Sequence, residues 1–518
     1  MLQRWILMLT QPGPVEPEML AHHYPGAGTA DEPYRIDFLK HDPHDPMQFP
    51  PWLRWMLCCI CGGATFSVAF ISSSYASGVT QIAKDLGSSE GIATLGLSLF
   101  LVGFIVGPLF WAPASEWLGR RPIFVLSLGG HVALNVCLCF CPNLAAVLPL
   151  RLLSGAFGAS SLTNAGAVIA DTFPPQVRGL AITVYALVPL FAPILGPLVG
   201  SFVAEAWGWR ALMELNALLS ASAWIALLIA LPETYAPVLL RLRAQHIGEL
   251  TGKVCVSSMA VQPSDEPGVR LRDVLSRPIR LAVHQPILLL LAGYQAIVFG
   301  TLYMAFAAFP IVHSAGRGWS PGMSGLSILG LVGSRCSVLF QLWDHHRYAR
   351  LIERLAPQHP SPEARLPGCC LGSVSLTIGL FWLAGTSSPH FHWLWSITAG
   401  IPFGFGVVLI TIGSTSYLVD AYTVFAASAL TVCICARAAC GAFSPLLIRQ
   451  AFSILSVRWA LSIPATLALV CAPFPFVLYH CGPQMRSQSG LARPLKSISF
   501  QDRDQNSWPD WTPLLPQV

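Results

Sequence analysis

The sequence predicts an all-α membrane protein in which twelve transmembrane helices form two six-helix bundles. The composition, the number of long apolar segments and the distribution of basic residues lead to this fold class. Charged residues make up 11% of the 518 residues and hydrophobic residues 54%, whereas a soluble domain has about 25% charged residues. So few polar side chains cannot cover a chain of this length, and we therefore expect lipid to surround it.

Twelve apolar segments are long enough for a helix to cross the bilayer core, which takes about 20 residues. The prolines and glycines inside them do not argue against helices, because membrane helices tolerate both. In chain order, the predicted spans are Leu57–Gly78, Ile92–Pro113, Pro122–Phe140, Ala145–Phe173, Leu180–Val203, Ala211–Leu231, Pro286–Phe309, Gly322–Leu342, Gly368–Gly385, Trp393–Leu418, Val424–Leu447 and Ala460–Tyr479.

The basic residues orient these spans, because Lys and Arg gather on the cytoplasmic side of a membrane. With both termini inside, 22 of the 30 Lys and Arg residues lie in inner segments and 5 in outer loops. The remaining three, Arg151, Arg335 and Arg437, fall inside predicted spans. This bias favours an even number of spans and cytoplasmic ends.

A polar stretch divides the spans into six and six. We predict a disordered, cytoplasmic N-terminal tail over residues 1–56, rich in proline, histidine and acids. A bundle over 57–231, a cytoplasmic linker over 232–285, a second bundle over 286–479 and a cytoplasmic tail over 480–518 follow. Two such bundles joined by an inner linker are typical of a carrier that opens alternately to the two sides.

Several classes of function are disfavoured. The net charge of +5 is small and dispersed, so no nucleic-acid partner is expected. Most of the 15 cysteines fall in apolar spans, where they are expected to be small apolar helix residues, and Cys433 and Cys435 are one residue apart, which is not zinc-ligand spacing. No metal site or disulfide framework is therefore expected. No nucleophile and base cluster together, so we predict neither an enzyme nor a cofactor.

The segment from Gly107 to Arg121 ends in a charged turn between the second and third spans. It brings together Glu116, Gly119, Arg120 and Arg121. Glycine permits a tight turn, and paired cations suit the inner side. We interpret these residues as a short, charged membrane turn, in which Glu116 pairs with Arg120 or Arg121 or caps a helix. A weaker version of this motif, an acid followed by a base in the segment from Asp344 to Tyr348, follows the eighth span.

The fifth span is rich in proline and glycine. Pro193 and Pro197 can kink it, and Gly196 and Gly200 form a face that a neighbouring helix can approach closely. The residues predict either a flexible helix at the seam between the bundles or an ordinary kinked packing helix.

Ionisable residues within the membrane suggest sites of proton coupling. Arg151 either faces a cavity or snorkels to the outer interface, while Arg437 lies deeper in its span and is the stronger cavity candidate. Asp171 lies at the inner end of the fourth span, and we take Arg151 and Asp171 as candidates for proton coupling. His131 could titrate, but a hydrogen-bonded structural histidine is the preferred interpretation.

A broad aromatic pocket with few polar anchors would suit small amphipathic organic molecules. The polar and aromatic residues predicted to line a cavity are Asn164, Tyr185, Asn216, Tyr294, Gln295, Tyr303, Tyr417 and Arg437.

Together these motifs resemble the major facilitator superfamily, and more narrowly its fungal branch of twelve-span drug:proton antiporters. The match runs through the turn from Gly107 to Arg121, Arg151 with Gly155 and Gly158, and the fifth-span segment from Gly196 to Gly200. It departs from the branch before Trp459, where Phe452 and Ser456 replace the usual Tyr and Gly.

The resemblance implies export of a drug, toxin or secondary metabolite, with protons moving inward. It implies that Glu116, Gly119, Arg120 and Arg121 form a conformational latch that stabilises the outward-open state. It also implies that Arg151 takes part in proton transfer. We expect a monomer in the lipid bilayer of the plasma membrane. The alternatives are a carrier of polyamines or other solutes, which should have acids facing its cavity, and a non-transporting sensor on the same scaffold.

Overall fold

The computed structural model describes residues 19–20, 22–40, 42, 44–259, 280–332, 336–355, 361–422 and 426–488. Five long helices form the first half of the membrane region. They are α3 (Pro51–Asp85), α4 (Glu90–Leu118), α5 (Arg120–Cys139), α6 (Leu144–Thr172) and α7 (Pro175–Ala230). Helix α7 contains both the fifth and sixth predicted spans, which separate at Gly208, where φ is 84°. A positive φ interrupts the helix there.

The second half follows the same plan with shorter pieces. It consists of α10 (Pro286–Arg317), α11 (Pro321–Leu326), α12 (Leu329–Val332), α13 (Cys336–Leu355), η3 (Pro362–Arg365), α14 (Pro367–Thr386), α15 (Trp393–Thr398), α16 (Gly400–Tyr422), α17 (Ala426–Ile454), α18 (Val457–Cys471) and α19 (Phe474–Gln488).

The eighth span is where the prediction of a continuous helix over Gly322–Leu342 was wrong. The structure divides this segment among α11, α12 and the start of α13. Close packing accompanies the division, since a Cβ on Gly330 would overlap the Ile397 carbonyl oxygen. Arg335 lies outside the described residues.

The predicted fold class is confirmed. In the described part of the chain, ten helical stretches are long and apolar enough to cross a membrane. One of them contains the fifth and sixth spans on either side of Gly208, and the divided α11–α13 segment supplies the eighth. These crossings account for the twelve predicted. Large apolar side chains such as Phe110, Leu218 and Val470 are mostly exposed, as expected for a surface in contact with lipid.

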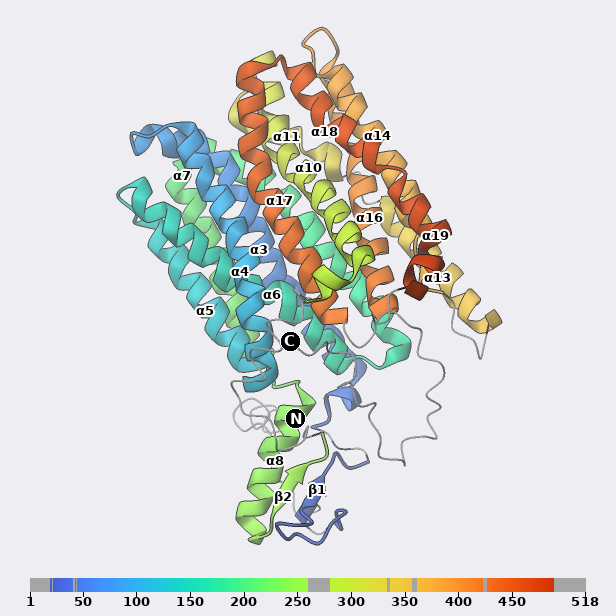
Figure 1. Ribbon diagram of the computed structural model, residues 1–518. Helices are drawn as coiled ribbons and strands as arrows, with labels where there is room; N and C mark the ends of the chain where they lie inside the picture. Colours follow the sequence, from blue (N-terminus) through green and yellow to red (C-terminus); the bar gives the residue numbers. More distant parts are fainter. Residues whose placement is uncertain are drawn as a thin grey trace, which may run out of the picture.

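The helices pack in two groups that face each other. In Figure 1, α3–α7 lie in blue to green on one side and α10–α19 in yellow to red on the other. Within the groups, α3 packs on α7, α4 on α6, α10 on α17 and α14 on α16. Between the groups, α4 contacts α17 and α7 contacts α11.

A small folded unit lies below the bundles, on the side predicted to be cytoplasmic, where disorder was predicted for residues 1–56 (Figure 1). Strand β1 (Tyr34–Ile36) pairs in parallel with β2 (Cys255–Ser257) beside helix α8 (Ala236–Thr251). Ile36 is buried against α8, and Asp42 forms a 2.5 Å ion pair with Arg243, with both side chains at most 1% exposed. The tail thus folds onto the linker. Residues 1–18, 260–279 and 489–518 of the predicted tails and linker lie outside the described residues.

Candidate functional site

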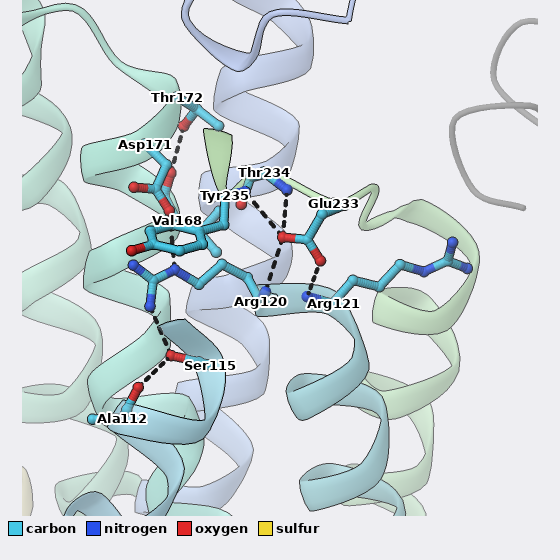
Figure 2. A network of polar contacts seen from close by, with 10 residues as sticks. All are labelled: Ala112, Ser115, Arg120, Arg121, Val168, Asp171, Thr172, Glu233, Thr234 and Tyr235. Atoms are coloured by element: carbon cyan, nitrogen blue, oxygen red, sulfur yellow. Dashed lines mark hydrogen bonds and ion pairs between the residues drawn. The ribbon is translucent and has the colours of Figure 1, made fainter. Parts of the chain in front are cut away.

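Arg120 is the centre of a polar network at the inner end of the first bundle (Figure 2). It begins α5, yet its side chain is largely buried. Its Nε lies 3.0 Å from Asp171 Oδ2 at the end of α6, and its Nη1 donates to Ser115 Oγ at 2.7 Å. The Tyr235 ring lies beside the guanidinium, 4.5 Å from Cζ to the ring centroid. The network therefore joins α4, α5 and α6 to the start of the linker.

Glu233 holds the start of α5 through the backbone. Its Oε1 accepts hydrogen bonds from the N–H groups of Arg120 (2.9 Å), Thr234 (3.0 Å) and Tyr235 (2.9 Å), and its Oε2 accepts one from Arg121 at 3.2 Å. The first N–H groups of a helix have no partner within the helix, so this carboxylate satisfies two of them. Burial raises the pKa of the Glu233 carboxyl, and the backbone donors oppose that rise.

Gly119 makes this contact possible. Its φ is 104°, a conformation that side chains other than glycine rarely adopt. A Cβ at this position would also overlap Glu233 Oε2. The turn predicted from the sequence therefore needs glycine both for its backbone and for its contact with Glu233.

The carboxylates of Asp171 and, through the backbone, Glu233 hold Arg120, and the pairing of Glu116 with Arg120 or Arg121 stays a prediction. Glu116 itself is exposed at the end of α4. The Arg121 side chain points away from this network and donates to the Leu228 carbonyl at 3.4 Å (Figure 2). Glu233 was not among the residues predicted for the latch, so sequence reasoning missed its role.

A similar arrangement occurs at the inner end of the second bundle. Arg365, just before α14, lies 3.0 Å from Asp420 at the end of α16, as Arg120 lies beside Asp171. Its guanidinium stacks on Tyr348, 3.4 Å from the ring centroid, and the Tyr348 hydroxyl donates to Asp420 at 3.0 Å. The motif from Asp344 to Tyr348 thus contributes Tyr348 to this second network, in which Arg365 is the counterpart of Arg120.

Arg151 is packed inside the first bundle. It is 0% exposed, which excludes both snorkelling to the interface and lining an open cavity in this conformation. Its guanidinium donates to the carbonyl oxygens of Gly96 (3.1 Å) and Ile71 (3.4 Å), between the rings of Tyr75 and Phe100. His131 is likewise buried, and its Nδ1 lies 2.8 Å from the Ser154 carbonyl oxygen.

Arg437 differs from Arg151 in being partly exposed. Its guanidinium lies over the Phe299 ring, 5.1 Å from the centroid, and within electrostatic range of the Tyr303 and Tyr185 hydroxyls. The Tyr303 hydroxyl lies 3.0 Å from Ser72 Oγ in the other bundle. Arg437, Tyr303 and Tyr185 are therefore the predicted cavity residues that the structure brings together between the bundles.

The other predicted cavity residues lie in helix contacts within single bundles. Asn216 accepts a hydrogen bond from Ser74 at 3.0 Å, and Gln295 donates to Ser414 at 2.6 Å. Tyr294 and Tyr417 are both buried, each in a different cluster of apolar side chains. Asn164 is 0% exposed, and its amide has no hydrogen-bond partner among the residues that the structure describes.

The fifth-span motif packs α7 against α3. A Cβ on Gly196 would lie 2.6 Å from the Phe70 carbonyl oxygen, so only glycine permits this approach. Pro193 is buried, the Pro197 carbonyl accepts a hydrogen bond from Ser77, and Gly200 lies beside the same serine. The glycines of the motif thus pack inside the first bundle, while the Pro197 carbonyl oxygen also lies 3.4 Å from a Cβ built on Gly325 of α11, in the second bundle.

The seam between the bundles includes a polar contact at their outer ends. Glu205 Oε2 on α7 accepts hydrogen bonds from the Gly322 N–H at 2.5 Å and the Ser320 hydroxyl at 3.3 Å, at the start of α11. Nearby, a Cβ on Gly325 would lie 2.6 Å from Ser201. The two bundles are therefore closely apposed at this point.

Comparisons with known proteins agree with this architecture. A sequence-family model described as Major Facilitator Superfamily matches residues 61–445. The MFS-type efflux pump MFS2 of Trichophyton rubrum is 44% identical over 93% of this chain and 82% of the pump. The major facilitator superfamily multidrug transporter mdrA of Aspergillus fumigatus is 42% identical over 96% of this chain and 81% of that transporter.

The fold itself is also found among solved structures. The proton:xylose symporter XylE, bound to 6-bromo-6-deoxy-D-glucose, superposes with a TM-score of 0.60 over 83% of this chain and 96% of its own. Its sequence is 14% identical, so this likeness concerns the fold alone. The family match, the fungal relatives and the paired bundles together show that this chain is a multi-pass membrane transporter belonging to the Major Facilitator Superfamily.

Proposed function

We propose that the protein exports small amphipathic organic compounds, such as drugs or secondary metabolites, by proton antiport with alternating access. The observation that carries the proposal is the similarity to fungal efflux pumps and multidrug transporters across nearly the whole chain. The aromatic surroundings of Arg437 between the bundles support an organic substrate. The plasma membrane and a monomeric state are part of the same proposal.

The distribution of polar contacts supports alternating access. Each bundle has its own inner network, around Arg120 and around Arg365, so each can move as a unit. The outer contact of Glu205 consists of two hydrogen bonds to a carboxylate, and a hydrogen bond to a charged group contributes about 1.5–3 kcal/mol net. A contact of that strength can open and close within a transport cycle.

Asp171 is the better supported of the two candidates for proton coupling. Its side chain is 20% exposed and is open to the cytoplasmic side, and protonation would remove its charge beside Arg120. Arg151 keeps a positioning role in this proposal, because its guanidinium binds carbonyl oxygens inside the first bundle. Glu116 and Arg121 flank the latch on the inner surface. A polyamine substrate is disfavoured, because Arg437 would repel it.

The test is efflux from a yeast strain that lacks its own drug exporters. Cells expressing the protein should accumulate less Nile red, an uncharged amphipathic dye, than control cells, and a protonophore should abolish the difference. The variants Arg120→Ala and Asp171→Asn should reduce efflux at equal surface expression, whereas Glu116→Gln should reduce it less. Equal dye accumulation with and without the protein, across a panel of amphipathic dyes, would exclude the proposed export.

A further inference from the structure

We propose that Arg437 forms an anion subsite in the transport cavity, so that the preferred substrates carry a carboxylate on an aromatic or apolar body. This inference rests on the proposed export function and specifies its substrate class. The motivating observation is a cation deep in the membrane region whose charge no described residue neutralises.

The depth of Arg437 makes its charge costly. It lies eleven residues after Ala426, where α17 begins, which corresponds to about 16 Å along a helix. The bilayer core is about 30 Å thick. A charged group at such a depth is retained where it faces a cavity or a partner, and such residues mark substrate pathways.

The contacts of Arg437 leave its charge open to a ligand. Arg120, Arg243 and Arg365 each contact a carboxylate, and Arg151 donates to carbonyl oxygens. Among the described residues, no carboxylate or hydrogen-bond acceptor lies within bonding distance of the Arg437 guanidinium, which lies instead over the Phe299 ring. Arg437 as a residue is also partly exposed, which in this proposal is the route by which an anion reaches it.

The surroundings suit a flat apolar body next to the charge. Phe299 lies under the guanidinium, and the next turn of α17 brings Gly441 close to Tyr303 and to Leu101 of α4. The Tyr303 hydroxyl reaches Ser72 of the first bundle. An aromatic carboxylate bound to Arg437 would therefore place its ring where the two bundles meet, and the bound ligand would contact both bundles. A guanidinium also matches a carboxylate in geometry, with two parallel N–H donors.

The experiment compares two probes of nearly equal shape on the purified protein in lipid nanodiscs. Radiolabelled 2-naphthoate carries the carboxylate, and 2-naphthamide is its neutral counterpart. We expect naphthoate to bind at least tenfold more tightly than naphthamide. Arg437→Gln should abolish that preference by weakening naphthoate alone, and Arg437→Lys should retain part of it. Arg210→Gln, which removes a half-exposed arginine near Asp85 at the outer side, is the matched control and should change neither affinity.

Several outcomes would overturn the inference. They are equal affinity for the two probes, unchanged naphthoate affinity in Arg437→Gln, or no carboxylate binding across a panel that also includes benzoate and octanoate. If a thermal scan shows that Arg437→Gln is not folded, the inference is tested by the Arg437→Lys protein and by the comparison of the two probes on the wild type. Proton-dependent efflux of a neutral dye, together with any of these failures, would leave the proposed export standing and remove only the anion subsite.

Discussion

At the scale of single residues, Glu233 supports the inner network more than any other side chain. Glu233→Ala leaves four backbone N–H groups without their acceptor, at about 1–3 kcal/mol for each group that stays buried and unpaired. Glu233→Gln retains the Oε1 contacts, but its amide NH2 group then faces the Arg121 N–H, so that two donors meet. We expect a large fall in the thermal unfolding midpoint for Ala and a smaller one for Gln, measured on detergent-purified protein. Glu249→Ala, on the exposed face of α8, should be silent, and a silent Glu233→Ala would contradict the assignment.

The same carboxyl group predicts a dependence of stability on pH. Burial raises the pKa of Glu233 above its ordinary value of 4.5, so the folded protein binds a proton that the unfolded chain releases. Stability from this group therefore increases as the pH falls through its folded pKa, and the gain is complete below 4.5. The wild type should gain in unfolding midpoint relative to Glu233→Gln when detergent samples are scanned from pH 7.5 to 5. A constant difference would contradict the prediction.

The residue types at the latch could be predicted from the sequence, but their partners could not. Gly119 and Arg120 stand out because a glycine followed by a cation at the end of a span is typical of a tight turn on the inner side. Glu233 lies 113 positions from Arg120, and only the return of the sixth span brings it to the same place. Arg437 could be identified as a cavity candidate from its depth alone, whereas Arg151, also within a span, is enclosed by Tyr75 and Phe100.

At the scale of elements, the contact of α3 with α7 depends on Gly196. Gly196→Ala places a methyl group 2.6 Å from the Phe70 carbonyl oxygen, and a backbone atom cannot turn aside as a side chain can. The helices must separate, and such overpacking costs about 1–3 kcal/mol. We expect less folded protein in fluorescence-detected size-exclusion chromatography, and reduced efflux from the protein that remains. Gly166→Ala on α6, where a Cβ would meet nothing within 4 Å, is the control, and equal behaviour of both variants would refute this packing argument.

The docking of the N-terminal tail depends on the ion pair of Asp42 and Arg243. Removing one partner of a buried pair leaves an uncompensated charge, at about 3–5 kcal/mol. Asp42→Ala should therefore detach β1 from β2 and expose residues 22–40 to limited proteolysis, while the membrane region stays intact. The exchange Asp42→Arg with Arg243→Asp should restore part of the protection. Asp37→Ala, on the exposed part of the tail, should leave protection unchanged, and rapid cleavage of the wild type at the same sites would exclude a docked tail.

Hydropathy predicted the spans well because a helix in lipid must be apolar along its length. It failed where helix packing or short strand pairing decides the structure. The break between α11 and α12 is accompanied by close contacts such as that of Gly330 with Ile397, which a window of apolar residues does not register. Strands β1 and β2 have three residues each, too few for a periodic pattern. The two strands are separated in the sequence by the whole first bundle, so neither the tail nor the linker indicates the pairing when it is considered alone.

At the scale of the whole molecule, the polar contacts within a bundle differ from those between bundles. The inner networks are anchored by ion pairs that include Arg120–Asp171 and Arg365–Asp420. Between the bundles, hydrogen bonds such as Ser72–Tyr303 and Glu205–Gly322 join groups that carry at most one formal charge. Pairs charged on both sides, with good geometry, are stronger than a neutral hydrogen bond such as Ser72–Tyr303, and the Glu205 contact is charged on one side alone. The molecule should therefore separate along the seam before either bundle deforms.

Glu205 offers the sharpest test of that expectation. Glu205→Ala removes the acceptor that holds Ser320 and Gly322, which weakens the outer contact by about 1–3 kcal/mol and should shift the population toward outward-open molecules. Ser77, part-buried and hydrogen-bonded to Ser201 beside this seam, reports the change. A cysteine placed there should react several-fold faster with an impermeant maleimide, measured against the same protein without that cysteine. Glu214→Ala, an exposed acid on the same helix, should not alter the rate. Unchanged labelling in Glu205→Ala would mean that the outer ends are held by apolar packing instead.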